Sequence, residues 1–178
     1  QALGDLQALY ALVGTPATAI DGEHWINAPD RPDTIAIARG KVYLIQFTAH
    51  WCAPCRNSYP GMKAVAARFA AAPFETIFVT QLYGTFEGRP ATASEELADN
   101  QAYDITRLGI PFRIAINPGG NAQPASGTNE GRYKVMGIPQ IVVIDKRGMI
   151  RQIVTGWDQG NTARLTALVE SLVREPAM

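Results

Sequence analysis

The sequence has few cysteines, few histidines and no excess of either charge, and each shortage excludes a class of protein. Two cysteines in 178 residues are too few for a disulfide-rich fold. Sixteen basic residues balance sixteen acidic ones, whereas nucleic-acid-binding domains carry a basic excess, so we expect no nucleic-acid partner. No apolar run approaches the roughly 20 residues of a membrane-spanning helix. The first residue is Gln1, and we expect a removed leader or a longer parent protein.

The composition and the hydrophobic periodicity predict one α/β domain. A hydrophobic fraction of 47% suits a globule with a sizeable core. The patterns predict strands over residues 42–48, 74–82, 112–116, 140–145 and 149–155, and helices over 3–13, from 54 onward, from 94 to near 109, and around 165–173. Residues 15–40 are expected to be loop with short strands, and residues 117–131 an exposed loop. Alternating strands and helices favour a central mixed β-sheet flanked by helices.

The two cysteines stand between a predicted buried strand and a predicted helix. Residues 42–48 form a near-continuous apolar run, which is typical of a central strand. We therefore predict that Cys52 is exposed at the N-terminal tip of the following helix. A free thiol has a pKa of about 8.5, and the unpaired N–H groups and partial positive charge of a helix N-terminus stabilise its thiolate. Cys55 follows about one turn later, so Cys52 is predicted to be the nucleophile and Cys55 the resolving thiol.

Four neighbours of the pair are candidates for tuning or substrate contact. Ala53 and Pro54 lie between the cysteines, and we expect them to influence thiolate stability and the reduction potential. A protonated His50 could stabilise a Cys52 thiolate, although a polar residue at this position often simply faces water. Trp51 could be substrate-facing surface, packing, or both.

The same cysteine spacing also fits half of a zinc site. Structural zinc needs four Cys or His ligands, and the sequence offers no second cysteine pair and only two histidines, His24 and His50. Two inert buried cysteines are the other alternative. The strand before the pair, the helix after it and the adjacent Trp51 favour redox chemistry, so we predict no metal and no organic cofactor.

Two segments carry a family resemblance. The WCAPC segment at 51–55 resembles the active-site motif of the thioredoxin superfamily, and GIPQ at 137–140 resembles its cis-proline loop. With the surrounding residues they resemble the TlpA/ResA-like, AhpC/TSA-related branch. The resemblance implies a thioredoxin-like fold that is a single domain overall. It further implies an N-terminal helix and extension over 1–27, a thioredoxin-like domain over 28–178 and a central helix–strand insertion.

The resemblance also implies a site and a function. The Ile138–Pro139 bond would be cis, and the backbone beside Pro139 would pair with an extended substrate peptide as an added strand. A simple turn proline before a strand is the alternative. The implied activity is thiol-disulfide exchange with protein substrates that carry cysteines or disulfides, sustained by an upstream redox partner. The implied location is extracytoplasmic, in the bacterial periplasm or cell envelope, and a membrane tether could lie outside the sequence shown.

Three residues depart from the family pattern. Thioredoxins have a buried acid where this chain has Gln46, and TlpA/ResA-like proteins often have a glutamate where it has Ser58. Neither side chain titrates at ordinary pH, so no group for moving a proton to or from Cys55 is identified, and water is an option. Gln140 stands where the family commonly has threonine, which would alter the substrate contact.

Two other functions remain open at this stage. One is a thiol-dependent peroxidase of the AhpC/TSA type, although the proline that precedes a peroxidatic cysteine in peroxiredoxins has no counterpart among residues 48–51. The other is a non-catalytic protein that binds extended peptides or copper. Copper-delivery relatives of the fold use a wider cysteine spacing and a distal histidine, and this chain has neither.

Overall fold

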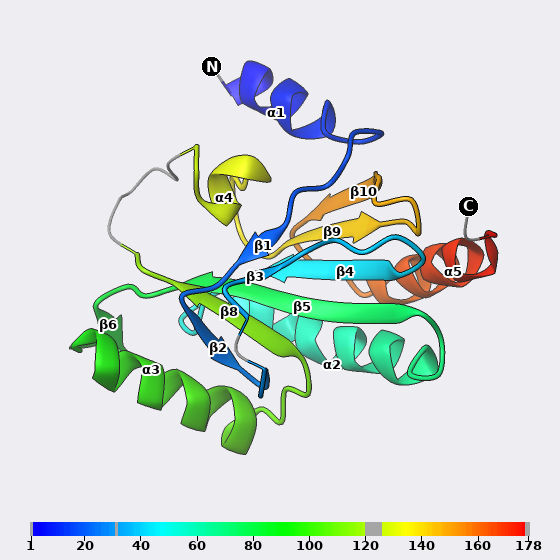
Figure 1. The fold of residues 1–178 in the computed structure, drawn as a ribbon. Coiled ribbons are helices and arrows are strands. Elements are labelled where there is room, and N and C mark those ends of the chain that lie inside the picture. The colour runs from blue at the N-terminus through cyan, green and yellow to red at the C-terminus, as the bar shows by residue number, and fades with distance from the viewer. Residues whose placement is uncertain (1, 31, 120–125, 177–178) are drawn as a thin grey trace.

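A six-stranded mixed sheet forms the centre of the molecule. The computed structural model describes residues 2–30, 32–119 and 126–176. The strand order is β10–β9–β4–β5–β8–β2 (Figure 1), in which β5 runs parallel to β4 and to β8 and the other pairs are antiparallel. The strands are β2 (His24–Ile26), β4 (Val42–Phe47), β5 (Phe74–Gln81), β8 (Arg113–Asn117), β9 (Gln140–Ile144) and β10 (Ile150–Thr155). The predicted mixed α/β sheet is confirmed.

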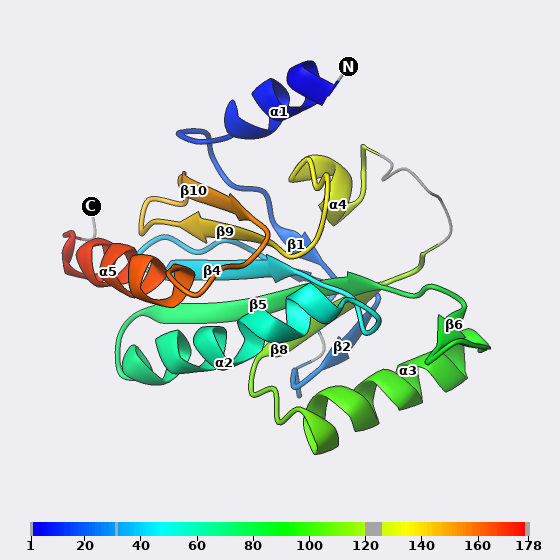
Figure 2. The same ribbon diagram turned by 180° about the vertical axis from the view of Figure 1, so that it is seen from behind.

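Each face of the sheet has its own hydrophobic core. Helices α2 (Ala53–Arg68) and α5 (Asn161–Arg174) cover one face (Figure 2), where Met62 and Leu165 are completely buried. On the opposite face, Tyr43 and Phe47 of β4 pack with Tyr133, which follows the short helix α4 (Asn129–Arg132). Strand β4 is therefore buried on both faces, as its near-continuous apolar run predicts.

An insertion between β5 and β8 stands at one end of the sheet. It consists of a small hairpin, β6 (Thr85–Phe86) and β7 (Arg89–Pro90), then α3 (Ala93–Gln101) and a π-helical turn, η1 (Ala102–Arg107). The helix predicted from Ser94 begins one residue earlier, at Ala93. Thr92 is the N-cap, because its side chain accepts the Glu95 N–H while the Glu95 carboxylate accepts the Thr92 N–H.

Two further expectations need correction. Residues 120–125 of the predicted exposed loop at 117–131 lie outside the described residues, and the end of this segment forms α4, whose first residue Asn129 is buried. Helix α1 (Ala2–Tyr10) is shorter than the predicted 3–13, and its apolar residues Leu3 and Leu6 are exposed, whereas Leu9 is buried. Helical spacing of apolar residues indicates a common face but does not supply a partner for it, and α1 stands away from the sheet (Figure 1).

The N-terminal region contributes short strands, as expected. Strands β1 (Ile20–Asp21) and β3 (Thr34–Ile35) pair with each other. Strand β2 lies within the predicted extension of residues 1–27 and pairs with β8, so the edge of the central sheet is built from this segment.

Candidate active site

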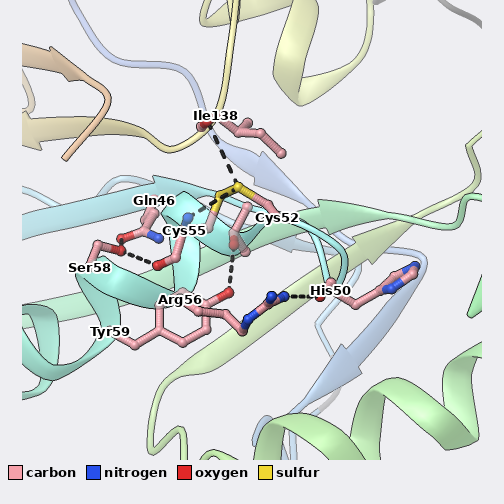
Figure 3. Close-up of a disulfide and its surroundings, with 9 residues drawn as sticks. Gln46, His50, Cys52, Cys55, Arg56, Ser58, Tyr59 and Ile138 are labelled. Atoms are coloured by element: carbon pink, nitrogen blue, oxygen red, sulfur yellow. Dashed lines mark hydrogen bonds between the residues drawn. A yellow bond between two sulfur atoms is a disulfide. The ribbon is translucent and has the colours of Figure 1, made fainter. Parts of the chain in front are cut away.

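Cys52 and Cys55 form a disulfide at the start of α2 (Figure 3). Strand β4 delivers the chain to this point, and Cys52 is the N-cap, with its sulfur accepting the Cys55 N–H at 3.2 Å. Ala53 and Pro54 open the helix, so the predicted strand-to-helix turn is confirmed. The expectation of an exposed Cys52 is wrong for this disulfide form, because the residue is only 3% exposed and Cys55 is fully buried.

The loop before β9 explains why Cys52 is covered. The Ile138–Pro139 bond is cis, as the resemblance implies, and the Ile138 carbonyl oxygen lies 3.8 Å from Cys52 Sγ (Figure 3). Two segments 86 positions apart in the sequence thus meet at the sulfur. The Gln140 side chain takes no part, since it is completely buried and donates to the Tyr133 carbonyl at 2.9 Å.

A neutral polar pair lies behind Cys55, on the side of α2 (Figure 3). Ser58 Oγ is 2.6 Å from the Cys55 carbonyl oxygen and 2.9 Å from the side-chain oxygen of Gln46. The hydroxyl has one proton, which it donates to Cys55. With the Gln46 amide turned over, its buried and otherwise unpartnered nitrogen donates to Ser58 Oγ, so that the hydroxyl both donates and accepts. Neither group can accept a proton from a thiol as a carboxylate would.

A second polar contact connects α2 to the end of β4. The Tyr59 hydroxyl lies 2.6 Å from Thr48 Oγ1, and both residues are buried. Burial raises the pKa of Tyr59, so its hydroxyl stays protonated. The Tyr59–Thr48 contact therefore ties α2 to the turn that carries the cysteines without adding a charge.

His50 faces neither water nor the sulfurs. Its ring points away from the disulfide (Figure 3), is stacked on Phe86 at a centroid distance of 4.7 Å, and has Nε2 3.6 Å from Glu96 Oε1. Burial lowers the pKa of His50, and the nearby Glu96 carboxylate opposes this shift. Arg56 donates to the His50 carbonyl at 2.9 Å and so fastens the turn to α2.

Trp51 is the exposed aromatic beside the disulfide. The residue is 55% exposed, and its ring meets Tyr83 edge-on at a centroid distance of 5.4 Å. Next to it lies a groove of about 700 Å³, into which Ile138 also faces. Further lining residues are Phe47, Thr48, Tyr83, Lys134 and Met136. The sequence reasoning did not single out Tyr83, because nothing in its local pattern marks a residue at the end of a strand as a neighbour of the cysteines.

Within residues 2–30, 32–119 and 126–176, no group of three or more His, Cys, Asp or Glu side chains is arranged to hold a metal ion. No helix in this part of the chain has the length and apolar character needed to cross a bilayer.

Comparisons with known proteins agree with this geometry. The chain is similar to the thioredoxin-like protein YneN of Bacillus subtilis, with 30% identity over 67% of the chain and 59% of the relative. It is also similar to the thiol-disulfide oxidoreductase ResA of Geobacillus kaustophilus, with 28% identity over 66% of the chain and 56% of the relative. The chain thus spans less than two thirds of the length of these two relatives.

A third relative and a solved structure match over more of their length. The thiol:disulfide interchange protein DsbE of Pseudomonas aeruginosa is 27% identical over 93% of this chain and 80% of its own. The crystal structure of the thioredoxin-like superfamily protein SPOA0173 superposes with a TM-score of 0.71 at 24% identity, over 92% of this chain and 99% of that one. A family model described as Redoxin matches residues 13–168. The chain therefore has a thioredoxin-like fold and belongs to the Redoxin family.

Proposed function

We propose that the protein is a thiol-disulfide oxidoreductase that acts on protein substrates through Cys52 and Cys55. The observation that carries this proposal is the disulfide at the N-terminus of α2 with the Ile138 carbonyl beside Cys52 Sγ. The names of the relatives YneN, ResA and DsbE point to the same class of chemistry.

In the reducing direction, the Cys52 thiolate attacks one sulfur of a substrate disulfide. A mixed disulfide forms between Cys52 and the substrate, and the other substrate sulfur leaves as a thiolate that takes up a proton. The Cys55 thiolate then attacks Cys52 Sγ and releases the second substrate thiol. The product is the Cys52–Cys55 disulfide, so two electrons pass to the substrate. The reverse sequence oxidises a substrate dithiol.

The assignment of the two roles rests on position. Cys52 Sγ is at the N-cap and accepts the Cys55 N–H, so a Cys52 thiolate would be stabilised by the helix terminus. Cys55 lies behind it, completely buried and close enough to bond. A substrate therefore reaches Cys52 before Cys55. Because Cys52 is only 3% exposed, the Ile138 loop or the groove beside Trp51 would first have to open slightly.

The groove beside Trp51 supports a peptide as the substrate. Ile138 and Pro139 precede β9, and an extended chain laid along them would bring a cysteine to Cys52. The groove volume of about 700 Å³ exceeds what a single side chain fills. Trp51 would provide an apolar wall, and Ala53 and Pro54 would tune the pair from within the turn, whereas the His50 ring points away from the sulfurs (Figure 3).

The remaining parts of the proposal rest on the family resemblance. An upstream redox partner would return the pair to its starting state, since each turnover changes its oxidation state by two electrons. We propose that the protein lies outside the cytoplasm, in the periplasm or cell envelope, because protein disulfides form and persist in such oxidising compartments. Fractionation of the source cells with an antibody against the chain tests this location, and a purely cytosolic signal contradicts it.

Serine variants test the proposed chemistry. Cys52→Ser is expected to lose all turnover of a peptide disulfide substrate, because no nucleophile remains at the helix end. Cys55→Ser is expected to accumulate a mixed disulfide that mass spectrometry detects and dithiothreitol releases. The chain has no other cysteine, so the double serine variant is a thiol-free control. Full activity of Cys52→Ser would overturn the proposal, and an adduct on Cys55 alone would reverse the two roles.

A further inference from the structure

The insertion places the fully buried carboxylate of Glu96 against the backbone of Tyr83, whose ring contacts Trp51. Glu96 lies on α3, and its two oxygens accept the backbone N–H groups of Tyr83 and Gly84, each at 2.8 Å. Hydrogen bonds to an ionised acceptor are about twice as strong as neutral ones. Gly84 has a φ of 71°, so the chain turns sharply where it leaves β5, and Glu96 holds this turn from inside.

Tyr83 connects Glu96 to the redox site through its ring. Its ring meets Trp51 edge-on at 5.4 Å and His50 edge-on at 5.7 Å. Burial raises the pKa of Tyr83 to about 12, so the ring carries no charge at neutral pH. Trp51 is largely exposed, so its aromatic contact with Tyr83 is what limits the rotation of the Trp51 side chain.

Glu96 also faces the turn that precedes Cys52. His50 Nε2 lies 3.6 Å from Glu96 Oε1, and the His50 ring is stacked on Phe86 of β6. One carboxylate thus lies against both the exit of β5 and the residue before Trp51. These segments are more than 30 positions apart in the sequence, and the insertion joins them.

We propose that Glu96 is a positioning residue for the redox site, which holds Tyr83 so that Trp51 keeps its place as a wall of the substrate groove. The inference deepens the proposed function and rests on it. Glu96 has no contact with either sulfur, and the chemistry at Cys52 depends on the start of α2 and the Ile138 loop. The expected defect of a Glu96 variant is therefore in substrate binding rather than in the exchange step.

Glu96→Gln tests the proposal with a side chain of the same shape. One oxygen becomes an NH₂ group that faces a backbone N–H, so one of the two charged hydrogen bonds is replaced by a donor–donor clash. KM for a cysteine-containing peptide disulfide is expected to rise about tenfold. The kcat and the midpoint potential of the cysteine pair are expected to stay within twofold and within error, respectively, of the unmodified protein.

Glu95→Gln is the matched control on the same helix. Glu95 is the neighbouring residue, is exposed, and accepts the Thr92 N–H at the helix start. The control is expected to leave KM unchanged. If Glu96→Gln does not fold, Glu96→Asp keeps the charge, withdraws the carboxylate from Tyr83 and Gly84, and is expected to raise KM in the same way.

A second readout does not depend on activity. The indole N–H resonance of Trp51, assigned with Trp51→Phe, is expected to shift or broaden in Glu96→Gln and to stay in place in Glu95→Gln. An unchanged KM together with an unchanged Trp51 resonance would overturn the positioning role, as would a fall in kcat or a moved potential at constant KM. Absence of exchange activity in the unmodified protein would instead defeat the proposed function, while the resonance would still report on the role of Glu96.

Discussion

Ser58 donates a 2.6 Å hydrogen bond to the carbonyl oxygen of Cys55, and both residues are completely buried. The side-chain amide of Gln46 lies on the same side of Cys55, 2.9 Å from Ser58 Oγ. Cys55 must lose a proton before it can attack a mixed disulfide at Cys52, and the two side chains behind it are neutral. The resolving step in the proposed mechanism therefore depends on a proton acceptor beyond this pair, and water is the simplest one.

An acid placed behind Cys55 is expected to speed up resolution. Gln46→Glu is nearly isosteric, and burial will raise the pKa of the new carboxyl towards neutrality, where it can act as a base. General-base assistance of this kind predicts a rate of peptide-thiol release from the Cys52 mixed disulfide that is about 10 to 100 times faster at pH 7. Single-turnover stopped-flow measurements, in which the reduced protein is mixed with an excess of the peptide disulfide, would give this rate.

Gln140→Glu is the matched control for that experiment. Gln140 is equally buried, but it lies opposite Phe47 in the sheet register and bonds to Tyr133, on the face away from α2. The same substitution there adds a buried acid without placing it beside Cys55, and no acceleration is expected. Equal acceleration in both variants would show that the gain does not come from a base behind Cys55.

His50 is expected to make the protein less stable in mild acid. Burial lowers the pKa of His50 below its ordinary value of 6.5, so the unfolded chain takes up this proton first as the pH falls. The His50 contribution to stability is thus complete above pH 6.5 and declines as the pH falls through the folded-state pKa. His50→Gln cannot titrate and is expected to flatten the dependence of the unfolding free energy on pH below pH 6.5, as measured by urea denaturation.

The other histidine gives the control for this prediction. His24 has a side chain that is 40% exposed, and His24→Gln is expected to retain the slope of the unmodified protein. A His50→Gln variant with an unchanged slope would mean that the buried imidazole is not the titrating group.

Asp104 is expected to act in the opposite pH direction. It lies in the π-helical turn of the insertion, and burial raises its pKa from 3.8 to about 7. Because the folded-state value is the higher one, stability is fully present below pH 3.8 and is lost as the pH rises through 7. Asp104→Asn is therefore expected to raise the free energy of unfolding at pH 8 by about 2 to 4 kcal/mol and to change it little at pH 4.

Urea denaturation at the two pH values would measure this difference. Asp99→Asn is a suitable comparison, because Asp99 forms a surface ion pair with Arg89 and its loss should cost less than about 1 kcal/mol. A gain in stability for Asp104→Asn that is the same at pH 4 and pH 8 would contradict a buried, titrating carboxyl.

The features that could be predicted from sequence are those with a local signal. The near-continuous apolar run of β4 predicts a strand buried on both faces, and the structure shows one. The spacing of Cys52 and Cys55 before a helical pattern predicts a pair at the start of α2, and the resemblance at 137–140 implies the cis bond at Pro139. Each of these depends on a few consecutive residues, so no knowledge of the tertiary fold is needed.

Features that depend on distant contacts could not be predicted in the same way. Glu95 and Glu96 together are typical of a solvated helix start, and Glu95 is exposed as that pattern predicts, whereas Glu96 is fully buried. The difference arises because Glu96 points towards the backbone of Tyr83, which lies in the connection between β5 and β6. The burial of Cys52 has the same kind of cause, since the Ile138 loop that covers it comes from the other half of the chain.

Two glycine-to-alanine changes are expected to have opposite effects on stability. A Cβ at Gly61 of α2 would lie 2.5 Å from ring carbon Cζ2 of Trp157, and closer still to the hydroxyl of Thr162, where α5 packs against α2. Gly61→Ala is therefore expected to lower the free energy of unfolding by about 1 to 3 kcal/mol, although alanine is the better helix former. Gly4 of α1 has no neighbouring atom within 4 Å of such a Cβ, and Gly4→Ala is expected to raise stability by about 0.5 to 1 kcal/mol. Urea denaturation monitored by tryptophan fluorescence measures both, and stabilisation by Gly61→Ala would show that α2 and α5 do not approach each other this closely.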